Sequence, residues 1–229
     1  MAKFIIDAGH GGSDSGATYN GRKESNDVLR LALRVGELLK KNGQTVLYTR
    51  ESDKTVSLSE RSVFENKNGC DYFVSIHRNA YQPEAAKGVE THIYSNGSSA
   101  EQLANKVNLE LVNVGLVDRK VKVSNFHVLR ETKNPAVLIE VGFIDNSSDN
   151  KLFDSKFEAI AQGIARGCLR QVGKEFIVSN NILDDDTYFR VICGSYKDRS
   201  NAIKQQNKLK ATGFDSFLEV YKKCDCCTK

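Results

Sequence analysis

The chain has 229 residues, of which 40% are hydrophobic and 27% charged, and its formal net charge is +4 at pH 7. This length suits one full domain plus a small second one, and no run is apolar enough for membrane insertion. The weak, dispersed positive charge gives no ground for nucleic-acid binding. The first residues, MAKFIIDAGHGG, lack the long apolar core and cleavage site of a secretory signal, so we expect synthesis in the cytoplasm without a signal peptide.

Strand and helix patterns alternate along the first 172 residues. Continuously apolar runs such as YFVSI and AVLIEV are typical of strands that helices cover on both faces of a sheet. The predicted fold class is therefore α/β, with a mostly parallel twisted sheet and helices on both faces. In chain order, strands are predicted at 3–7, 45–49, 71–77, 88–94 and 136–141, and helices at 24–42, 57–67, 99–114 and 155–171.

The end of the chain departs from this alternation. Residues 175–186 have three consecutive aspartates and no sustained apolar period, so they are interpreted as a linker after a domain at 1–174. Residues 187–229 predict a small β-α-β unit, with a helix at RSNAIKQQNKLKATG between two strand-like runs. A unit of this size buries little surface by itself, so we expect it to associate with a partner.

Six cysteines are present, but the pattern does not predict a disulfide framework. A chain of this size without an export signal is expected to keep its thiols reduced. Three of the cysteines crowd the tail, where disulfide pairing, metal binding and a simple exposed end are all open: Cys224, Cys226 and Cys227.

Three strand-like runs end in a residue suited to metal binding or proton transfer, namely His10, His77 and Glu140. Glu24 begins a long amphipathic helix after the first of these runs. Loops at the ends of parallel strands gather reacting groups at one sheet edge. Each residue alone has a structural explanation, such as a first-turn carboxylate on the helix dipole for Glu24. The four together indicate a functional site.

Zinc hydrolases use three protein ligands drawn from histidine nitrogens and carboxylates, with one position left for water. His10, Glu24 and His77 form such a set and predict Zn²⁺ as the cofactor. Glu140 is the only acidic residue in AVLIEVGF, and its burial favours a separate role as general acid and base. The glycine-rich loop DAGHGGSDSG also resembles a phosphate cradle, but a dinucleotide fingerprint read from Gly9 ends on Asp14, whose charge repels pyrophosphate.

The segments DAGHGG, SIHRNA, KGVETHIYS and NPAVLIEVGFIDN resemble, in this order, the zinc-dependent N-acetylmuramoyl-L-alanine amidases of the type 3 amidase family. The resemblance covers residues 3–172. It implies a peptidoglycan hydrolase that uses zinc-activated water to cleave the amide between N-acetylmuramic acid and L-alanine of the stem peptide. It also implies that His10, Glu24 and His77 are the zinc ligands and that Glu140 is the catalytic glutamate.

Several residues depart from this pattern or stand outside it. Arg78 occupies a position where the family often has alanine, which is expected to alter the cleft without removing a ligand. The segment between Leu116 and Pro135 is too short for the inhibitory helix of regulated members, so an open site is expected. His92 alternates along a strand and is expected to be a surface or packing residue. His127 is a candidate for substrate contact in the cleft.

The C-terminal unit, 187–229, resembles one half of the sporulation-related repeat (SPOR) domain, which uses a sheet surface to hold glycan strands. The resemblance implies a cell-wall-binding unit, and the missing half implies a homodimer through it. An amidase without a signal peptide would reach the wall through a membrane lesion and cause cytolysis, as phage or prophage endolysins do. Two alternatives are a zinc peptidase acting on free cell-wall peptides and a non-catalytic cell-wall-binding protein.

Overall fold

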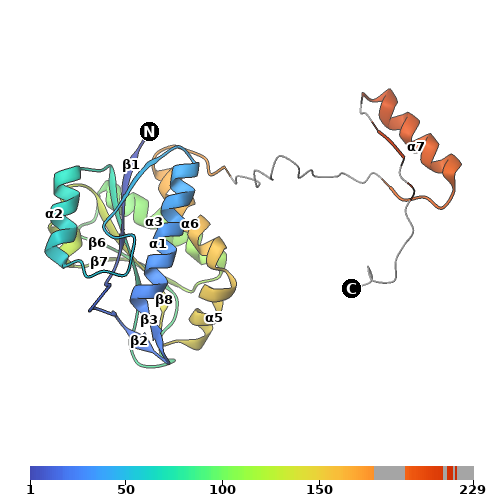
Figure 1. Ribbon diagram of the computed structural model, residues 1–229. Coiled ribbons are helices and arrows are strands. Elements are labelled where there is room, and N and C mark those ends of the chain that lie inside the picture. Colours follow the sequence, from blue (N-terminus) through green and yellow to red (C-terminus); the bar gives the residue numbers. More distant parts are fainter. Residues whose placement is uncertain (178–193, 214–215, 219, 221–229) are drawn as a thin grey trace. The chain divides into compact units, whose positions relative to one another are not determined.

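The computed structural model describes residues 1–177, 194–213, 216–218 and 220. The chain divides into two units, Met1–Ser179 and Asn180–Lys229, and the first contains a six-stranded sheet with helices on both faces (Figure 1). The strands are β1 (Lys3–Ala8), β2 (Thr18–Tyr19), β3 (Arg22–Lys23), β4 (Thr45–Tyr48), β5 (Tyr72–Asn79), β6 (Val89–Ile93), β7 (Asp118–Val123) and β8 (Ala136–Phe143). The helices are α1 (Glu24–Lys41), α2 (Leu58–Asn68), α3 (Ser99–Val114), α4 (His127–Arg130), α5 (Ser147–Ser155) and α6 (Phe157–Gln171), with α7 (Arg199–Ala211) in the second unit.

The large sheet has the order β4-β1-β5-β8-β6-β7. Its pairs are parallel except for β6 and β8, which are antiparallel, so β6 and β7 run opposite to the other four strands. This arrangement confirms the predicted fold class. It also has a consequence for the site: the first residues of β6 and β7 lie at the same sheet edge as the last residues of β1, β5 and β8.

The two faces of the sheet carry cores of different size. The larger core packs α1, α3 and α6 against residues such as Phe4, Ile6 and Val74. The smaller core holds Ile5, Phe73 and residues of α4 on the other face, with α2 beside it. Because side chains alternate along a strand, polar residues that follow the smaller core on β1, β5 and β8 project from that same face at the strand ends.

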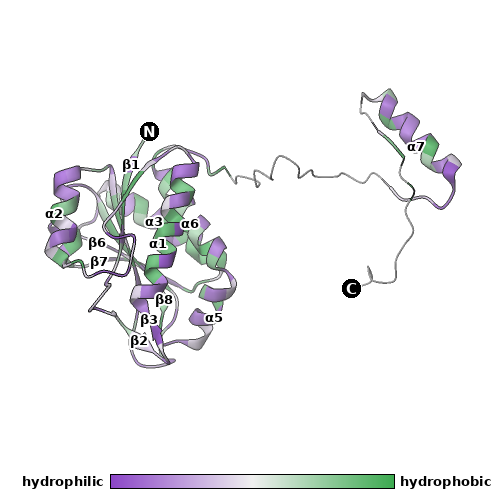
Figure 2. Ribbon diagram, in the orientation of Figure 1, coloured by the Kyte–Doolittle hydropathy of each residue, from purple (hydrophilic) through white to green (hydrophobic). Residues whose placement is uncertain are grey.

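Local sequence explains where the main helices begin and end. In α1, acidic residues lie in the first turn and Lys40 and Lys41 in the last, as the helix dipole favours. A capping box begins α2, with Ser57 and Glu60 each accepting from the other's backbone N–H. Hydrophobic and hydrophilic residues share the helices in Figure 2, as expected where one face contacts the core and the other contacts solvent.

The structure corrects several element predictions. The helix predicted at 155–171 is preceded by a separate helix, α5, which the Asn146 side chain caps by accepting from two backbone N–H groups. The segment between Leu116 and Pro135 forms β7 and the one-turn α4, neither of which was predicted. Charged residues dominate β7, an edge strand with little burial, so its sequence has no clear apolar alternation. The short hairpin β2–β3 also lacked a strand-like pattern.

In the second unit, α7 confirms the predicted helix, and Asp198 caps its start by accepting from the backbone of Ser200 and Asn201. Gln206 donates to the carbonyl of Ser216 at 2.8 Å. The strand predicted before this helix lies mainly outside the described residues, and the one predicted after it lies partly outside them. In the part of the chain that is described, every helix is too short or too polar to span a membrane.

Candidate metal centre and active site

His10 lies in the loop after β1, and buried arginines fix the backbone beneath it. His10 has a positive φ of 57°, a conformation that costs free energy for a residue with a Cβ. Arg61 donates to the His10 carbonyl at 2.8 Å, and Arg50 donates to the Gly9 carbonyl at 2.8 Å. These bonds hold the loop in a position that the chain would not adopt by itself.

A buried ion pair with Asp7 anchors Arg61. Asp7 is fully buried and accepts from Arg61, Thr49 and Ser75. Burial would raise the pKa of Asp7, but Arg61 and the two hydroxyls outweigh it and lower the pKa, so the carboxylate stays ionised. Breaking such a buried pair typically costs about 3–5 kcal/mol, against about 0–1 kcal/mol for a surface pair. The backbone of the His10 loop is therefore held in place from its buried side.

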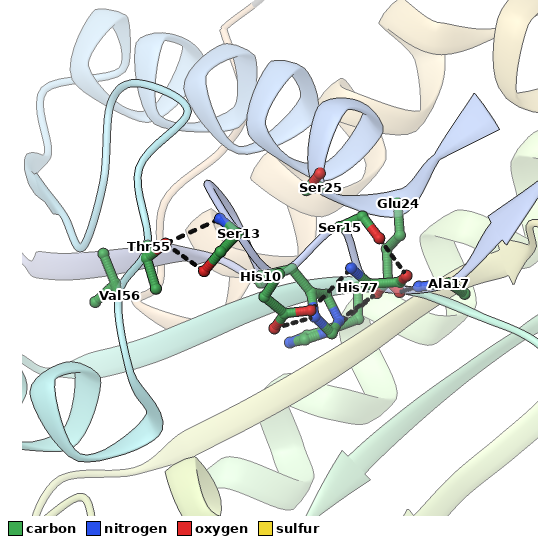
Figure 3. A network of polar contacts seen from close by, with 12 residues as sticks. His10, Ser13, Ser15, Ala17, Glu24, Ser25, Thr55, Val56 and His77 are labelled. Atoms are coloured by element: carbon green, nitrogen blue, oxygen red, sulfur yellow. Dashed lines mark hydrogen bonds and ion pairs between the residues drawn. The ribbon is translucent and has the colours of Figure 1, made fainter. Parts of the chain in front are cut away.

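Glu24, the first residue of α1, joins the two histidines. Its Oε1 lies 3.1 Å from His10 Nε2 and 3.0 Å from His77 Nδ1 (Figure 3). Backbone N–H groups of Ala17 and Arg78 donate to the same carboxylate at 2.9 and 3.0 Å. One donor atom from each of the three side chains lies within 4.8 Å of the others, and among the described residues this is the one group of that kind.

The electrostatics of the three side chains favour a cation between them. Burial would lower the pKa of both histidines, but hydrogen bonds and charge from Glu24 outweigh it, raising the pKa of His10 to about 9 and that of His77 above its usual value. Burial would raise the pKa of Glu24, yet the two histidines bring it well below its usual range. A carboxylate with two imidazoles around one point is a donor set that Zn²⁺ accepts. The three residues predicted as ligands thus come together and fit a metal ion.

Glu140 lies on β8, paired in register with His77 on β5. Partners in a parallel register project from the same face, so Glu140 stands beside the donor set and outside it. Burial raises the pKa of Glu140 to about 7, and its buried Oε2 has no hydrogen-bond partner among the described residues. A buried carboxylate without a partner costs folding free energy, which is a mark of a functional group.

Asp14 is a site residue that sequence reasoning missed. Its Oδ2 lies 2.8 Å from His10 Nδ1, and its Oδ1 accepts from the Gly16 backbone at 3.0 Å. A carboxylate on one ring nitrogen orients a ligand histidine and leaves the other nitrogen for the metal. The sequence pattern indicates only a charge that disfavours phosphate binding at this position. Its four-residue spacing from His10 across a glycine turn was the available signal.

Two glycines of the loop permit this close packing. A Cβ on Gly9 would stand 2.2 Å from His77 Cε1. A Cβ on Gly16, where φ is 63°, would stand 2.6 Å from Glu24 Oε2 and 2.7 Å from His10 Cδ2. The glycine-rich loop therefore permits close approach to the donor set.

Arg78 does not alter the cleft, contrary to expectation. It alternates with His77 along β5 and so projects from the opposite face, where it is 1% exposed. There it donates to Asp27 at 2.7 Å, and its guanidinium lies 4.4 Å from the Phe153 ring centroid. Its role in the structure is to join β5 to α1 and α5.

The other described histidines and cysteines lie outside the donor set. His92 is a packing residue, 6% exposed, with Nδ1 2.7 Å from Ser124 Oγ. His127 begins α4, and its Nε2 lies 3.2 Å from Ser62 Oγ on α2, which joins two helices. Cys70 and Cys168 are free thiols. The tail cysteines lie outside the described residues.

The fold and the site together define an α/β protein with a candidate metallohydrolase centre. Residues 4–170 match the family described as N-acetylmuramoyl-L-alanine amidase, and the chain belongs to this family. Residues 165–218 match the SPOR domain, a match that begins inside α6.

Similar proteins of known name agree with this membership. The chain is 38% identical to N-acetylmuramoyl-L-alanine amidase CwlM of Bacillus licheniformis over 222 residues, covering 95% of this chain and 85% of that protein. It is 38% identical to the endolysin of Bacillus phage SPP1 over 178 residues, which covers 73% of this chain and 65% of the endolysin. The solved catalytic domain of the amidase CwlV from Bacillus (Paenibacillus) polymyxa is 37% identical, with a TM-score of 0.72 over 76% of this chain and all of that one.

Proposed function

We propose that this protein is a zinc-dependent N-acetylmuramoyl-L-alanine amidase, which hydrolyses the amide between N-acetylmuramic acid and L-alanine in peptidoglycan. The observation that carries the proposal is the donor set of His10, Glu24 and His77 beside the unpartnered carboxylate of Glu140. Membership of the amidase family and the likeness to CwlM support the choice of bond.

His10, Glu24 and His77 would hold the zinc ion, and Asp14 orients His10 by accepting from Nδ1. Zinc, when bound, supplies positive charge that activates water and polarises the scissile carbonyl. Glu140 removes a proton from the attacking water and passes it to the nitrogen of L-alanine as the C–N bond breaks. Its raised pKa suits both halves of that transfer, because the carboxyl group gains and loses a proton near neutral pH.

Digestion of purified peptidoglycan tests the function. We expect new lactyl ends and free L-alanine amines by mass spectrometry, and loss of both when a chelator removes the metal. Added Zn²⁺ should restore cleavage in the chelated sample. Cuts between amino acids of the stem would instead support a peptidase, and an uncut sacculus that retains bound protein would support a non-catalytic wall-binding protein.

The second unit is proposed to bind glycan strands and bring the catalytic unit to the wall, with 1–174 as catalytic domain, 175–186 as linker and 187–229 as binding unit. The SPOR match supports wall binding. The pairing of two such units into a homodimer stays a prediction.

Truncation tests the binding role. Phe176 packs on the catalytic core and Ile177 donates to Asn42 at 2.7 Å, so a chain ending at Ser179 keeps these contacts. We expect this chain to cleave a small soluble muropeptide within about twofold of the full-length rate and to lyse sacculi about tenfold more slowly, because local concentration on the wall is lost. Equal effects on both substrates would contradict a targeting role.

Two similar proteins come from different biological settings. The bacterial amidase CwlM matches along 95% of this chain, whereas the phage SPP1 endolysin matches along 73%. This difference favours the setting of a bacterial wall amidase. The phage or prophage endolysin role stays a prediction.

A further inference from the structure

A row of side chains crosses the sheet edge from the donor set toward β7. His77 on β5 is paired in register with Glu140 on β8, and Glu140 is paired with Glu90 on β6. Residues paired in this way project from one face. Since β6 and β7 run opposite to the other strands, Glu90 and the start of β7 lie at the edge that carries the active site.

A cavity of about 430 Å³ lies at the far end of this row. It is lined by residues of β5, β6, β7 and β8 and by the loop after β5, including Asn79, Tyr81, Ala86, Glu90, Arg119 and Phe143. Asn79, two residues after His77 on β5, donates to Glu90 at 2.6 Å and so lies on the same side of the sheet as this row. The cavity is therefore a continuation of the active-site edge, with Glu140 between it and the donor set.

Arg119 lies at the wall of this cavity, and its two terminal guanidinium nitrogens are available to bind a ligand. Its Nε donates to Glu90 Oε2 at 2.8 Å, and its guanidinium carbon lies 4.8 Å from the Phe143 ring centroid. Among the described residues, neither terminal nitrogen of the guanidinium has a hydrogen-bond partner, and the side chain is 34% exposed. Two adjacent N–H donors in one plane match the two oxygens of a carboxylate.

Two cations, Arg119 and Lys122, pair with the single carboxylate of Glu90 at this end of the row. Glu90 is buried and also accepts from Lys122 and Asn79, so its single negative charge is shared by two cations. The exposed Lys120 is paired with Asp118 and adds no net charge. The terminal nitrogens of Arg119, which have no acceptor among the described residues, favour an anionic ligand at this wall of the cavity.

We propose that Arg119 binds a carboxylate of the stem peptide, one residue beyond the L-alanine, and so selects substrates with a free carboxylate there. This inference rests on the proposed amidase function. Glu140 gives its proton to the L-alanine nitrogen, which places the peptide side of the bond next to Glu140. β7 lies two strand spacings from β8, a distance of roughly 10 Å. Each extended residue of the stem peptide spans about 3.5 Å, so its second residue lies within reach of the long Arg119 side chain.

A pair of soluble muropeptides tests this subsite. When the second stem residue is a glutamate joined through its γ-carboxyl, its α-carboxyl is free in one substrate and amidated in the other. We expect the wild type to prefer the free carboxylate by about tenfold or more in kcat/KM, mainly through KM, because charge-assisted hydrogen bonds are lost with the amide. Arg119→Gln should bring this ratio close to one, and Arg119→Lys should restore part of it.

Arg34→Gln is the matched control. Arg34 also loses a surface ion pair when replaced, but it pairs with Glu37 and Glu158 on α1 and α6, away from the cavity, so the ratio should stay at the wild-type value. A wild type without preference, or Arg119→Gln with an unchanged ratio, would overturn the subsite. A wild type that cleaves neither muropeptide would overturn the proposed function and the subsite with it.

Discussion

Replacing Glu140 with glutamine is expected to lower kcat by about 10²–10⁴-fold while the zinc content stays at one ion per chain. Glutamine keeps the size of the side chain but cannot take a proton from water or give one to the leaving nitrogen. The donor set is left whole, because Glu140 stands one strand away from it and makes no hydrogen bond to it. Metal analysis and kinetics on one soluble muropeptide check both halves of the result.

Stability against pH supplies the folding control for this variant. In the metal-free protein the pKa of Glu140 is about 7, above its ordinary value of 4.5, so the folded state binds this proton more tightly than the unfolded state. The carboxylate therefore destabilises the fold as pH rises from about 4.5 to 7, with the full cost, roughly 3 kcal/mol, reached above pH 7. Metal-free Glu140→Gln should melt at the wild-type temperature near pH 4.5 and several degrees higher at pH 8.

Two outcomes would contradict this assignment. A Glu140→Gln protein that is folded but has lost its zinc would place Glu140 among the ligands. A variant that retains a tenth or more of the wild-type kcat would remove Glu140 from the proton transfer.

The sequence predicted the donor set because its members have rare side chains at informative places. His10 follows β1 and His77 lies near the end of β5, and the topology of parallel strands brings such positions to one edge. Glu140 was recognisable as the one charge within an apolar strand. In each case a local pattern carried the information, and the fold needed only to be of the α/β class.

Other parts of the site depend on contacts that no local pattern encodes. Arg61 and Arg50 hold carbonyls about 40 to 50 positions away along the chain, and either could be taken for an ordinary surface arginine. The orientation of Arg78 illustrates the same limit, since alternation places it opposite His77 but only the packing of α1 and α5 shows what it contacts. Arg119 lies on β7, whose charged sequence lacks the apolar alternation from which a strand is predicted.

Replacing His77 with alanine is expected to remove metal and activity together. The donor set falls from three side chains to two, and Glu24 loses the partner at 3.0 Å that helps to fix its carboxylate. We expect zinc content below a tenth of the wild-type value after dialysis, and kcat at least 10³-fold lower, because the metal ion and its chemistry are lost together. Zinc content is measured on the same preparation that is assayed.

His127→Ala is the control that separates the loss of a ligand from the loss of any histidine. His127 contacts Ser62 on α2 and lies outside the donor set, so its replacement should keep the zinc and most of the activity. Together with Glu140→Gln, the three variants give three distinct results: metal with activity, metal without activity, and neither. Full zinc content in His77→Ala would exclude His77 as a ligand and overturn the donor set of His10, Glu24 and His77.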